Sequence, residues 1–346
     1  MNPEIEVLGV FPSLDGAVVG GIQAAGREAW RGIVGYSGER RALALQYAPG
    51  ASKAGAVIAA MRTRARPDTI LVWHIHLVKV LPFLRRPTAR VALVLHGAEA
   101  WARQDAVTRR LLSRVAMIFC DSDHTWTRFV EHNPDLHALP HRTVHLGLGS
   151  AFEGQTPPPA ATPSALMIAR LDKGEDYKGH RQMIAAWPRV LDRMPDAQLR
   201  IVGDGDLRPE LEHTARARGA NGSIRFYGRV DEATKDALLA DARCLAMPSR
   251  GEGFGLVYLE AMRLGRPCLV STVDSGHEVV NPPEAGLAAP SDAPNEIADA
   301  AIRLMTTGQA WARWSAQARA RYEARFTAGC FHQRLLAALF ETSRPS

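Results

Sequence analysis

Short, nearly continuous apolar runs alternate with longer stretches of helical periodicity along the first half of the chain. The runs predict strands at residues 5–11, 69–74, 91–96, 116–122 and 143–146, with helices between most of them. A strand that is apolar along its whole length is buried on both faces, which is typical of a parallel sheet covered by helices. The pattern therefore predicts an α/β domain with a doubly wound sheet.

The second half repeats this alternation, with strands predicted at residues 165–169, 198–203, 224–227, 242–248 and 267–271. Between the halves, the run GQTPPPAATP at 154–163 predicts a linker, because its prolines cannot continue a helix or a central strand. We therefore expect two Rossmann-like α/β domains, at residues 1–153 and 164–327. Ligands of such sheets bind beyond the carboxyl ends of the strands, so a cleft between the two domains is the expected site.

Composition supports two globular domains. The chain has 346 residues, 46% of them apolar, which suffices for two cores. It has no apolar run of roughly 18 residues, the length of a membrane-spanning helix. Its first residues, MNPEIE, include acidic side chains where a signal peptide has basic ones. A cytoplasmic location is therefore expected. The four cysteines show no C-x-x-C spacing, so neither a disulfide framework nor a zinc site is expected.

The net charge of +6 lies entirely in the first half, where residues 1–150 hold 18 Lys and Arg against 12 Asp and Glu. No basic run is interleaved with aromatic residues and no helix-turn-helix signature is present, so nucleic acid is not an expected partner. Two stretches, 57–66 and 101–115, join arginines to apolar residues. They fit peripheral association with an anionic membrane, or ordinary surface helices with solvated arginines, and the sequence leaves both open.

The stretch RGEGFGLVYLE at residues 250–260 is the most informative motif. It places two carboxylates, Glu252 and Glu260, around a glycine-rich turn between a predicted strand and a helix that begins at Leu256. The glycines let the backbone approach an anion closely, and the exposed N–H groups of a helix start attract phosphate. A carboxylate is a natural partner for sugar hydroxyls, so both glutamates are expected to face one ligand.

Further candidates follow other strands of the second domain and should reach the same edge. Arg170 and Lys178 follow the strand at 165–169, where two cations can reach a diphosphate, although they also fit a surface pair. The turn at Gly203, Asp204 and Gly205 fits a position beneath a nucleoside or a plain turn. It is not a dinucleotide fingerprint, because G-x-G-x-x-G is absent.

The first domain offers its own candidates. Gly20 and Gly21 precede a helical pattern and fit a small backbone anion site or a tight turn. His96 ends a predicted strand, where an imidazole contacts a ligand or serves the structure. Glu99 and Trp101 have two interpretations. They could bind the acceptor, with the tryptophan stacked on a sugar, or they could be a helix-capping glutamate and a core tryptophan.

No metal site is expected. His74 and His76 alternate in the sequence, but a third ligand is not identified. The D-x-D pairs at 121–123 and 204–206 have a form that can hold a divalent ion on a nucleotide, yet each also fits a capping or turn role.

These motifs resemble those of the retaining glycosyltransferases of family 4, which have the two-domain GT-B architecture. The segment 252–260 is similar to the family's E-x7-E element, and Arg170 with Lys178 to its diphosphate-binding pair. Gly20 and Gly21 look like its N-terminal glycine loop, and 203–205 and 226–228 like its nucleoside-contact loops. The likeness covers nearly the whole chain, although the acidic insertion at 173–176 lengthens the spacing between Arg170 and Lys178.

The resemblance implies a role for each matching residue. Glu252 would contact hydroxyls of the donor sugar, Glu260 would bind the ribose, and His96 would contact the donor hexose. The first domain would bind the acceptor, the second domain the donor, and the last helix, about 328–343, would pack back on the first domain. The further donor-binding residues would be Gly20, Gly21, Gly203, Asp204, Gly205, Gly228, Arg229, Val230, Gly253, Phe254, Gly255 and Leu256.

The resemblance therefore implies an enzyme that transfers a hexose from a nucleoside diphosphate sugar to a hydroxyl acceptor with retention, without a required cofactor. The expected catalytic residues are His96, Arg170, Lys178 and Glu252. GDP-mannose is the expected donor, and a lipid-linked or oligosaccharide intermediate of bacterial surface polysaccharide, met at the inner face of the plasma membrane, is the expected acceptor. One alternative is a transferase that uses a UDP-sugar, glucose or N-acetylglucosamine, on a soluble small molecule. The other is a sugar-nucleotide-binding protein without turnover.

Overall fold

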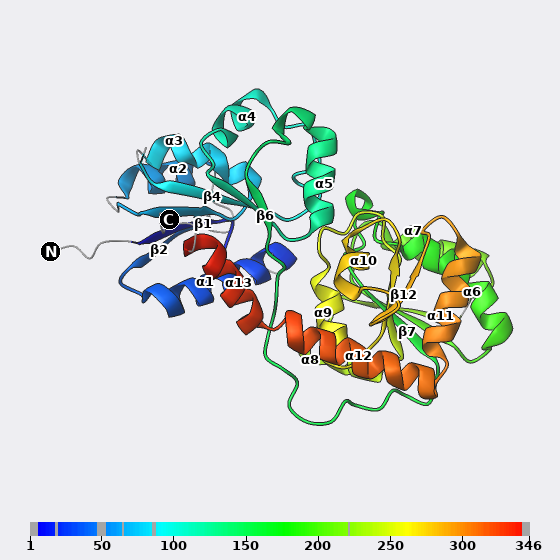
Figure 1. The fold of residues 1–346 in the computed structure, drawn as a ribbon. Helices are drawn as coiled ribbons and strands as arrows, with labels where there is room; N and C mark the ends of the chain where they lie inside the picture. Colours follow the sequence, from blue (N-terminus) through cyan, green and yellow to red (C-terminus); the bar gives the residue numbers. More distant parts are fainter. Residues whose placement is uncertain are drawn as a thin grey trace. The chain divides into compact units, whose positions relative to one another are not determined.

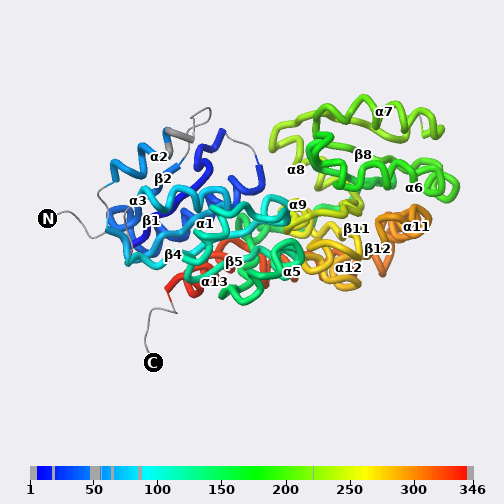
Figure 2. The backbone as a smooth tube through the Cα atoms, turned by 90° about the horizontal axis from the view of Figure 1, so that it is seen from above, coloured from blue at the N-terminus to red at the C-terminus, as the bar shows by residue number. Residues whose placement is uncertain are grey.

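The chain forms two compact units (Figure 1; Figure 2). Each is built on one six-stranded parallel sheet. The computed structural model describes residues 6–17, 20–46, 53–63, 66–84, 88–220 and 222–340. The chain passes from unit 1 to unit 2 between Gly149 and Ser150 and returns between Arg325 and Phe326. Among the described residues, no helix is both long enough and apolar enough to cross a membrane.

Unit 1 has the strand order β2-β1-β3-β4-β5-β6. Its strands are β1 (Val7–Phe11), β2 (Ala42–Gln46), β3 (Thr69–Val72), β4 (Arg90–Leu95), β5 (Met117–Cys120) and β6 (His141–Thr143). The helical segments are α1 (Gly21–Ser37), α2 (Lys53–Arg62), η1 (Ile75–Val80), α3 (Leu81–Leu84), α4 (Ala106–Leu112), α5 (Asp123–His132), η2 (Pro134–Leu136) and α13 (Ala328–Phe340).

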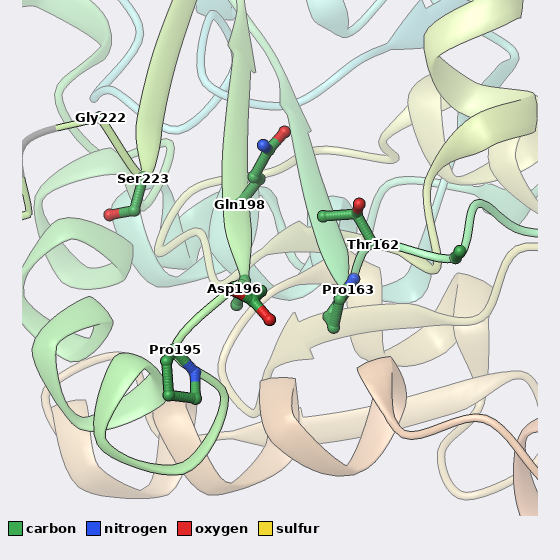
Figure 3. A pocket seen from close by; sticks show the side chains of 9 residues that line it. Thr162, Pro163, Pro195, Asp196, Gln198, Gly222 and Ser223 are labelled. Carbon is green, nitrogen blue, oxygen red and sulfur yellow. The ribbon is translucent and has the colours of Figure 1, made fainter.

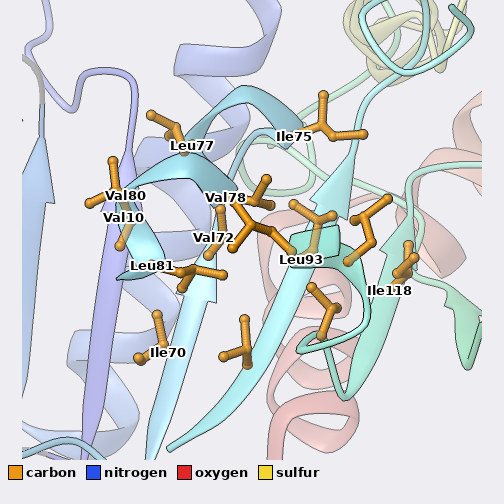
Figure 4. Packing of buried hydrophobic residues seen from close by; sticks show 14 of the residues in the cluster. Val10, Ile70, Val72, Ile75, Leu77, Val78, Val80, Leu81, Leu93 and Ile118 are labelled. Atoms are coloured by element: carbon orange, nitrogen blue, oxygen red, sulfur yellow. The ribbon is translucent and has the colours of Figure 1, made fainter. Parts of the chain in front are cut away.

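The apolar strands of unit 1 form its core. Val72 and Leu93 on neighbouring strands are fully buried, and they pack with Ile75 and Val78 from η1 in one apolar cluster (Figure 4). Burial of this kind stabilises a fold by roughly 25 cal/mol per Å2 of apolar surface. It also fixes the carboxyl end of β4, after which His96, Glu99 and Trp101 lie.

Helix α13 packs against α1 and so brings the end of the chain back to unit 1. His332 Nε2 lies 2.9 Å from both the backbone oxygen and a carboxylate oxygen of Glu28. Gly32 leaves room for this contact, because a Cβ there would lie 2.6 Å from the His332 ring. The last helix was expected at about 328–343, of which residues 341–343 lie outside the described residues.

Unit 2 has the strand order β12-β11-β10-β7-β8-β9. Its strands are β7 (Ser164–Ile168), β8 (Gln198–Val202), β9 (Ile224–Gly228), β10 (Cys244–Met247), β11 (Cys268–Ser271) and β12 (Gly286–Ala289). Its helical segments are η3 (Lys173–Glu175), α6 (His180–Arg193), α7 (Arg208–Ala217), α8 (Glu232–Asp241), α9 (Leu256–Arg263), α10 (Ser275–Val280), α11 (Pro294–Met305) and α12 (Gln309–Arg325).

The segment 154–163, predicted as a linker, contains no helix or strand and belongs to unit 2. Arginines hold its backbone to that unit. Arg243 donates to the carbonyl groups of Ala160 and Ala161, Arg266 donates to that of Pro157, and Arg319 donates to that of Gly154. These guanidinium contacts fix a segment that makes few backbone hydrogen bonds of its own.

Three strands differ from the sequence prediction. β2 and β12 were not predicted; both are edge strands, and neither carries a long run of bulky apolar residues. The strand predicted at 143–146 instead ends at Thr143, because its ladder partner β5 ends at Cys120. Val144 and Leu146, the apolar residues behind that prediction, are buried in the segment after the strand.

Candidate functional site

The carboxyl ends of β7 to β11 share one edge of the unit 2 sheet, because these strands are parallel. The loops that follow the strands carry the predicted donor-side residues. The sheet therefore brings segments from separate parts of the sequence to a single edge.

The glycine-rich turn leads from β10 into α9, which begins at Leu256 as predicted. Gly255 has φ 84°, and a Cβ there would lie 2.4 Å from the ring of buried Tyr258, so this position requires glycine. Gly253 and Phe254 are buried in the same turn. The turn leads directly into the first turn of α9, and the N–H groups at the start of a helix attract an anion.

Lys178 and Glu252 form an ion pair at this edge, with 2.8 Å between Nζ and Oε2. Each side chain is 15% exposed, so the pair is largely shielded from water. Burial lowers the pKa of Lys178, but the charge of Glu252, the neighbouring Tyr177 and Glu175, and the hydrogen bond to Glu252 raise it more, and the net pKa lies above its usual value. Lys178 is therefore a charged donor at neutral pH. The longer spacing from Arg170 in the sequence does not prevent Lys178 from reaching Glu252.

Arg170 follows β7 and extends into solvent, with 71% of its side chain exposed. Its guanidinium contacts the carboxylate of Glu175, and Asp172 lies 3.7 Å away. The acidic insertion at 173–176 forms the short helix η3 and supplies the first of these partners. The structure thus places both predicted diphosphate-binding cations in ion pairs with carboxylates.

Glu260 lies within α9 and pairs with Lys235 of α8 at 3.0 Å, not with a residue of its own turn. Burial raises the pKa of Glu260, although the charge of Lys235 and the hydrogen bond to it act in the opposite direction. Glu252 and Glu260 therefore have different cationic partners. Their predicted contact with one ligand stays a prediction.

The turn at 203–205 packs against the loop after β7. Gly203 has φ 135°, and a Cβ there would lie 1.8 Å from the carbonyl oxygen of Ala169. The N–H of Gly203 donates to Gly228 at 2.9 Å, and the carbonyl of Asp204 accepts from Leu171 at 3.0 Å. Three loops are thereby joined at the edge. The neighbouring positions Gly205, Arg229 and Val230 range from half-buried to exposed.

Asp274 was not among the predicted site residues, yet it contacts the Glu252 loop directly. Its Oδ2 accepts the N–H of Glu252 at 3.2 Å, and its Oδ1 accepts that of Gly276 at 3.0 Å. Burial, followed by the charge of Glu252, raises the pKa of Asp274 to about 7. In the sequence, Asp274 comes shortly after the predicted strand 267–271 and just before a helix, which is the position of an N-cap residue. This was the sequence feature by which Asp274 could have been found.

In unit 1, α1 begins at Gly21 and Gly20 is its N-cap residue; Val19, which precedes them, lies outside the described residues. His96 follows β4 and is buried; its Nε2 donates to the carbonyl of Trp73 at 2.8 Å. Burial and then the charge of His74 lower the pKa of His96 to about 3, so the imidazole is neutral at pH 7. Its predicted contact with a hexose stays a prediction.

Glu99 and Trp101 take positions that fit the structural alternative. Glu99 Oε1 accepts the N–H of His96 at 2.7 Å, and burial raises the pKa of Glu99 although this hydrogen bond lowers it. Trp101 packs on the core of unit 1 and against the ring of His124. Their acceptor-side role stays a prediction.

One aspartate of each D-x-D pair accepts a hydrogen bond from another segment of the chain. Asp123 accepts from the hydroxyl of Thr143, and Asp206 accepts the N–H of Lys173 at 2.7 Å. Across the part of the chain that the structure describes, no three His, Cys, Asp or Glu side chains are grouped as metal ligands would be.

A depression of about 620 Å3 lies elsewhere on unit 2 (Figure 3). Pro163, Asp196, Gln198 and Ser223 line it, and these residues precede or begin β7, β8 and β9. It is therefore at the amino ends of the strands, whereas the candidate site is at their carboxyl ends.

The fold is found in solved glycosyltransferases. HepE of Anabaena in complex with UDP-glucose superposes with a TM-score of 0.79 over 98% of this chain and 100% of that chain, at 19% identity. Two Rossmann-like units of this kind define the GT-B fold. Residues 162–307, which contain every donor-side candidate of unit 2, match the family model described as glycosyl transferases group 1. Over this segment, which is less than half of its length, the chain is similar to that family.

Two curated relatives are each similar to the chain over somewhat less than half of its length. A phosphatidyl-myo-inositol mannosyltransferase of Mycolicibacterium smegmatis is 35% identical over 156 residues, 45% of this chain and 39% of the relative. A GDP-mannose-dependent monoacylated alpha-(1-6)-phosphatidylinositol monomannoside mannosyltransferase of Corynebacterium glutamicum is 33% identical over 165 residues, 46% of this chain and 42% of the relative. The matches thus span about two fifths of the length of these relatives.

Proposed function

We propose that the protein is a glycosyltransferase that moves a hexose from a nucleoside diphosphate sugar to a hydroxyl acceptor, with retention at the anomeric carbon. The ion pair of Lys178 and Glu252 beside the start of α9 carries this proposal. One site offers a cation and helix N–H groups to a diphosphate, and a carboxylate to sugar hydroxyls. The family match over residues 162–307 supports it.

In this proposal the protein positions the reactants and neutralises charge. Arg170, Lys178 and the N–H groups at the start of α9 stabilise the departing diphosphate. An oxygen of that diphosphate takes the proton of the acceptor hydroxyl, on the same face on which the bond between sugar and phosphate breaks. This scheme uses neither a protein nucleophile nor a metal ion.

GDP-mannose is the proposed donor, because both relatives are named as mannosyltransferases and one as GDP-mannose-dependent. A UDP-sugar is the second candidate. It is favoured by the likeness to HepE, whose structure contains UDP-glucose and which is matched over nearly the whole chain.

For the acceptor we propose a lipid-linked or otherwise anionic molecule at the cytoplasmic face of the plasma membrane. The relatives are named for phosphatidylinositol acceptors, and residues 1–150 hold the whole excess of positive charge. Part of this charge is paired within unit 1, as in the contact of Arg109 with Asp135. Of the basic stretch 57–66, residues 64 and 65 lie outside the described residues.

The test is hydrolysis of GDP-mannose and UDP-glucose by the purified protein, with and without excess EDTA. We expect slow hydrolysis of one donor, unchanged by EDTA, and a loss of about 100-fold or more in Arg170→Ala and Lys178→Ala. Arg189→Ala is the control, because this arginine pairs with Asp299 away from the site. Near-wild-type turnover in both site variants would contradict the proposal. Binding of a sugar nucleotide without any turnover would favour a non-catalytic binding protein.

A further inference from the structure

Asp274 makes more contacts than a helix cap requires. It precedes α10, and its Oδ1 accepts the N–H of Gly276 at 3.0 Å, which completes the cap. Its other oxygen, Oδ2, accepts the N–H of Glu252 at 3.2 Å, 22 residues away along the chain.

The next residue of α10 holds the other side of Glu252. The hydroxyl of Ser275 donates to the carbonyl oxygen of Glu252 at 2.7 Å, and the N–H of Ser275 reaches the same oxygen at 3.3 Å. The two peptide groups that flank the Cα of Glu252 are therefore both bound to the start of α10. This leaves the side-chain torsions as the main freedom of Glu252.

The contact between α10 and the loop is closely packed. Asp274 is 4% exposed and Ser275 is fully buried. A Cβ on Gly276 would lie 2.8 Å from the hydroxyl of Tyr258, so the helix start leaves no room for a larger residue. Ser249, at the beginning of the same loop, also hydrogen-bonds the carboxyl group of Asp274.

Burying a carboxyl group costs free energy, and serine or asparagine can also cap a helix. What aspartate adds is a second acceptor oxygen that spans the gap to Glu252. Burial and the nearby charge of Glu252 raise the pKa of Asp274.

We propose that Asp274 is a positioning residue that fixes the backbone of Glu252, and thereby holds its carboxylate beside Lys178 and the hydroxyls of the donor sugar. This inference rests on the function proposed above. Asp274 touches neither the sugar nor the diphosphate in this scheme, and it acts through Glu252 alone.

Two substitutions separate positioning from charge. Asp274→Ser retains a hydroxyl that caps Gly276 but is too short to reach Glu252. Asp274→Asn retains the length and one acceptor oxygen, which can accept from Glu252 or from Gly276 but not from both, and it removes the charge. Asp105→Ser is the control, because Asp105 caps α4 in unit 1 through the N–H of Thr108 and has no contact with Glu252.

The measurements are the dissociation constants of GDP and UDP and the kcat and KM for hydrolysis of GDP-mannose and UDP-glucose. We expect Asp274→Ser to lose about tenfold or more in kcat/KM for the donor that the wild type uses, with its nucleotide affinity nearly unchanged. Asp274→Asn, whose oxygen still reaches Glu252, should lose less than Asp274→Ser, and Asp105→Ser should equal the wild type. Equal kcat/KM in Asp274→Ser and the wild type, or equal losses in both Asp274 variants, would overturn the inference.

Hydrogen exchange of the peptide 249–255 distinguishes failure of this inference from failure of the proposed function. If the wild type binds and hydrolyses no sugar nucleotide, the proposed function fails. Faster exchange in Asp274→Ser than in Asp274→Asn still shows that Asp274 holds the loop. Equal exchange in the two variants would contradict the positioning role even in an active enzyme.

Discussion

Lys178 Nζ and Glu252 Oε2 lie 2.8 Å apart, although 74 residues separate them in the sequence. Lys178 comes from the loop after β7 and Glu252 from the loop after β10, and these two strands are neighbours in the sheet of unit 2. The pair combines a charged donor with a carboxylate at the start of a helix. It is the contact on which the proposed donor site depends.

Glu252→Ala should affect the sugar more than the nucleotide. The carboxylate is the proposed partner of sugar hydroxyls, whereas the diphosphate is bound by cations and helix N–H groups. We expect kcat/KM for the donor to fall by about 100-fold while the affinity for the bare nucleotide is kept or rises, because Lys178 loses its anionic partner. Steady-state kinetics and calorimetric titration measure the two effects, and parallel losses would count against this role.

Glu175→Gln should strengthen nucleotide binding. The carboxylate of Glu175 pairs with Arg170, so a diphosphate has to compete with it for the guanidinium. The pair is exposed, which limits the expected gain to about two- to fivefold in the dissociation constant. Asp176→Asn is the matched control, since Asp176 pairs with Arg181 at 2.8 Å. The same gain in both variants would indicate a general effect of charge.

Asp274 should make the stability of unit 2 depend on pH. Burial and the charge of Glu252 raise the pKa of Asp274 to about 7. The hydroxyl groups of Ser249 and Tyr258 are its other polar or titratable neighbours. Lys178 is paired with Glu252. A carboxyl group whose pKa is higher in the folded than in the unfolded protein stabilises the fold most at low pH. This contribution is fully present below the unfolded pKa of about 3.9, and it is lost as the pH rises through the folded pKa of about 7.

Thermal unfolding of the wild type and Asp274→Asn from pH 5 to 8 measures this contribution. Relative to the variant, the wild type should lose stability with rising pH, by about 1–4 kcal/mol over the whole window. A difference that is constant with pH would show that Asp274 does not titrate in this range.

Gly32→Ala should loosen α13. A Cβ at Gly32 would lie 2.6 Å from the His332 ring, so the helix has to shift, at a cost of about 1–3 kcal/mol. Gly35→Ala is the control on the same helix, because, apart from its chain neighbours and the backbone of its own helix, no described atom lies within 4 Å of its Cβ position. It should stabilise α1 by about 0.5–1 kcal/mol. Thermal unfolding and hydrogen exchange at 328–340 would show the contrast, and equal behaviour of the two variants would refute it.

The sequence predicted those features that depend on local pattern. Apolar runs located the central strands, and the glycine at 255 located the start of α9 at Leu256. The edge strands β2 and β12 were missed, because an edge strand needs no continuous apolar run. The common edge of the loops followed from the expected parallel sheet, so the sequence alone was enough to place Arg170, Lys178 and Glu252 at that edge.

Pairing between side chains could not be read from the sequence. The partner of Glu260 is Lys235 on another helix, and that of Arg170 is Glu175 within the insertion. Asp274 was missed for the same reason: an N-cap signature marks a helix start, but only the packing of α10 against the loop shows the bond to Glu252. Such contacts depend on distances set by the whole fold.

Titration calorimetry of GDP and UDP tests the central claim most directly. It measures the binding of each nucleotide to the wild type, Lys178→Ala and Arg189→Ala. We predict that one of the two nucleotides binds the wild type and Arg189→Ala equally, and that Lys178→Ala binds it about tenfold or more weakly, because the diphosphate loses a charged partner. Equal affinity in all three proteins, or no binding of either nucleotide to the wild type, would contradict the assignment of this edge of unit 2 as the donor site.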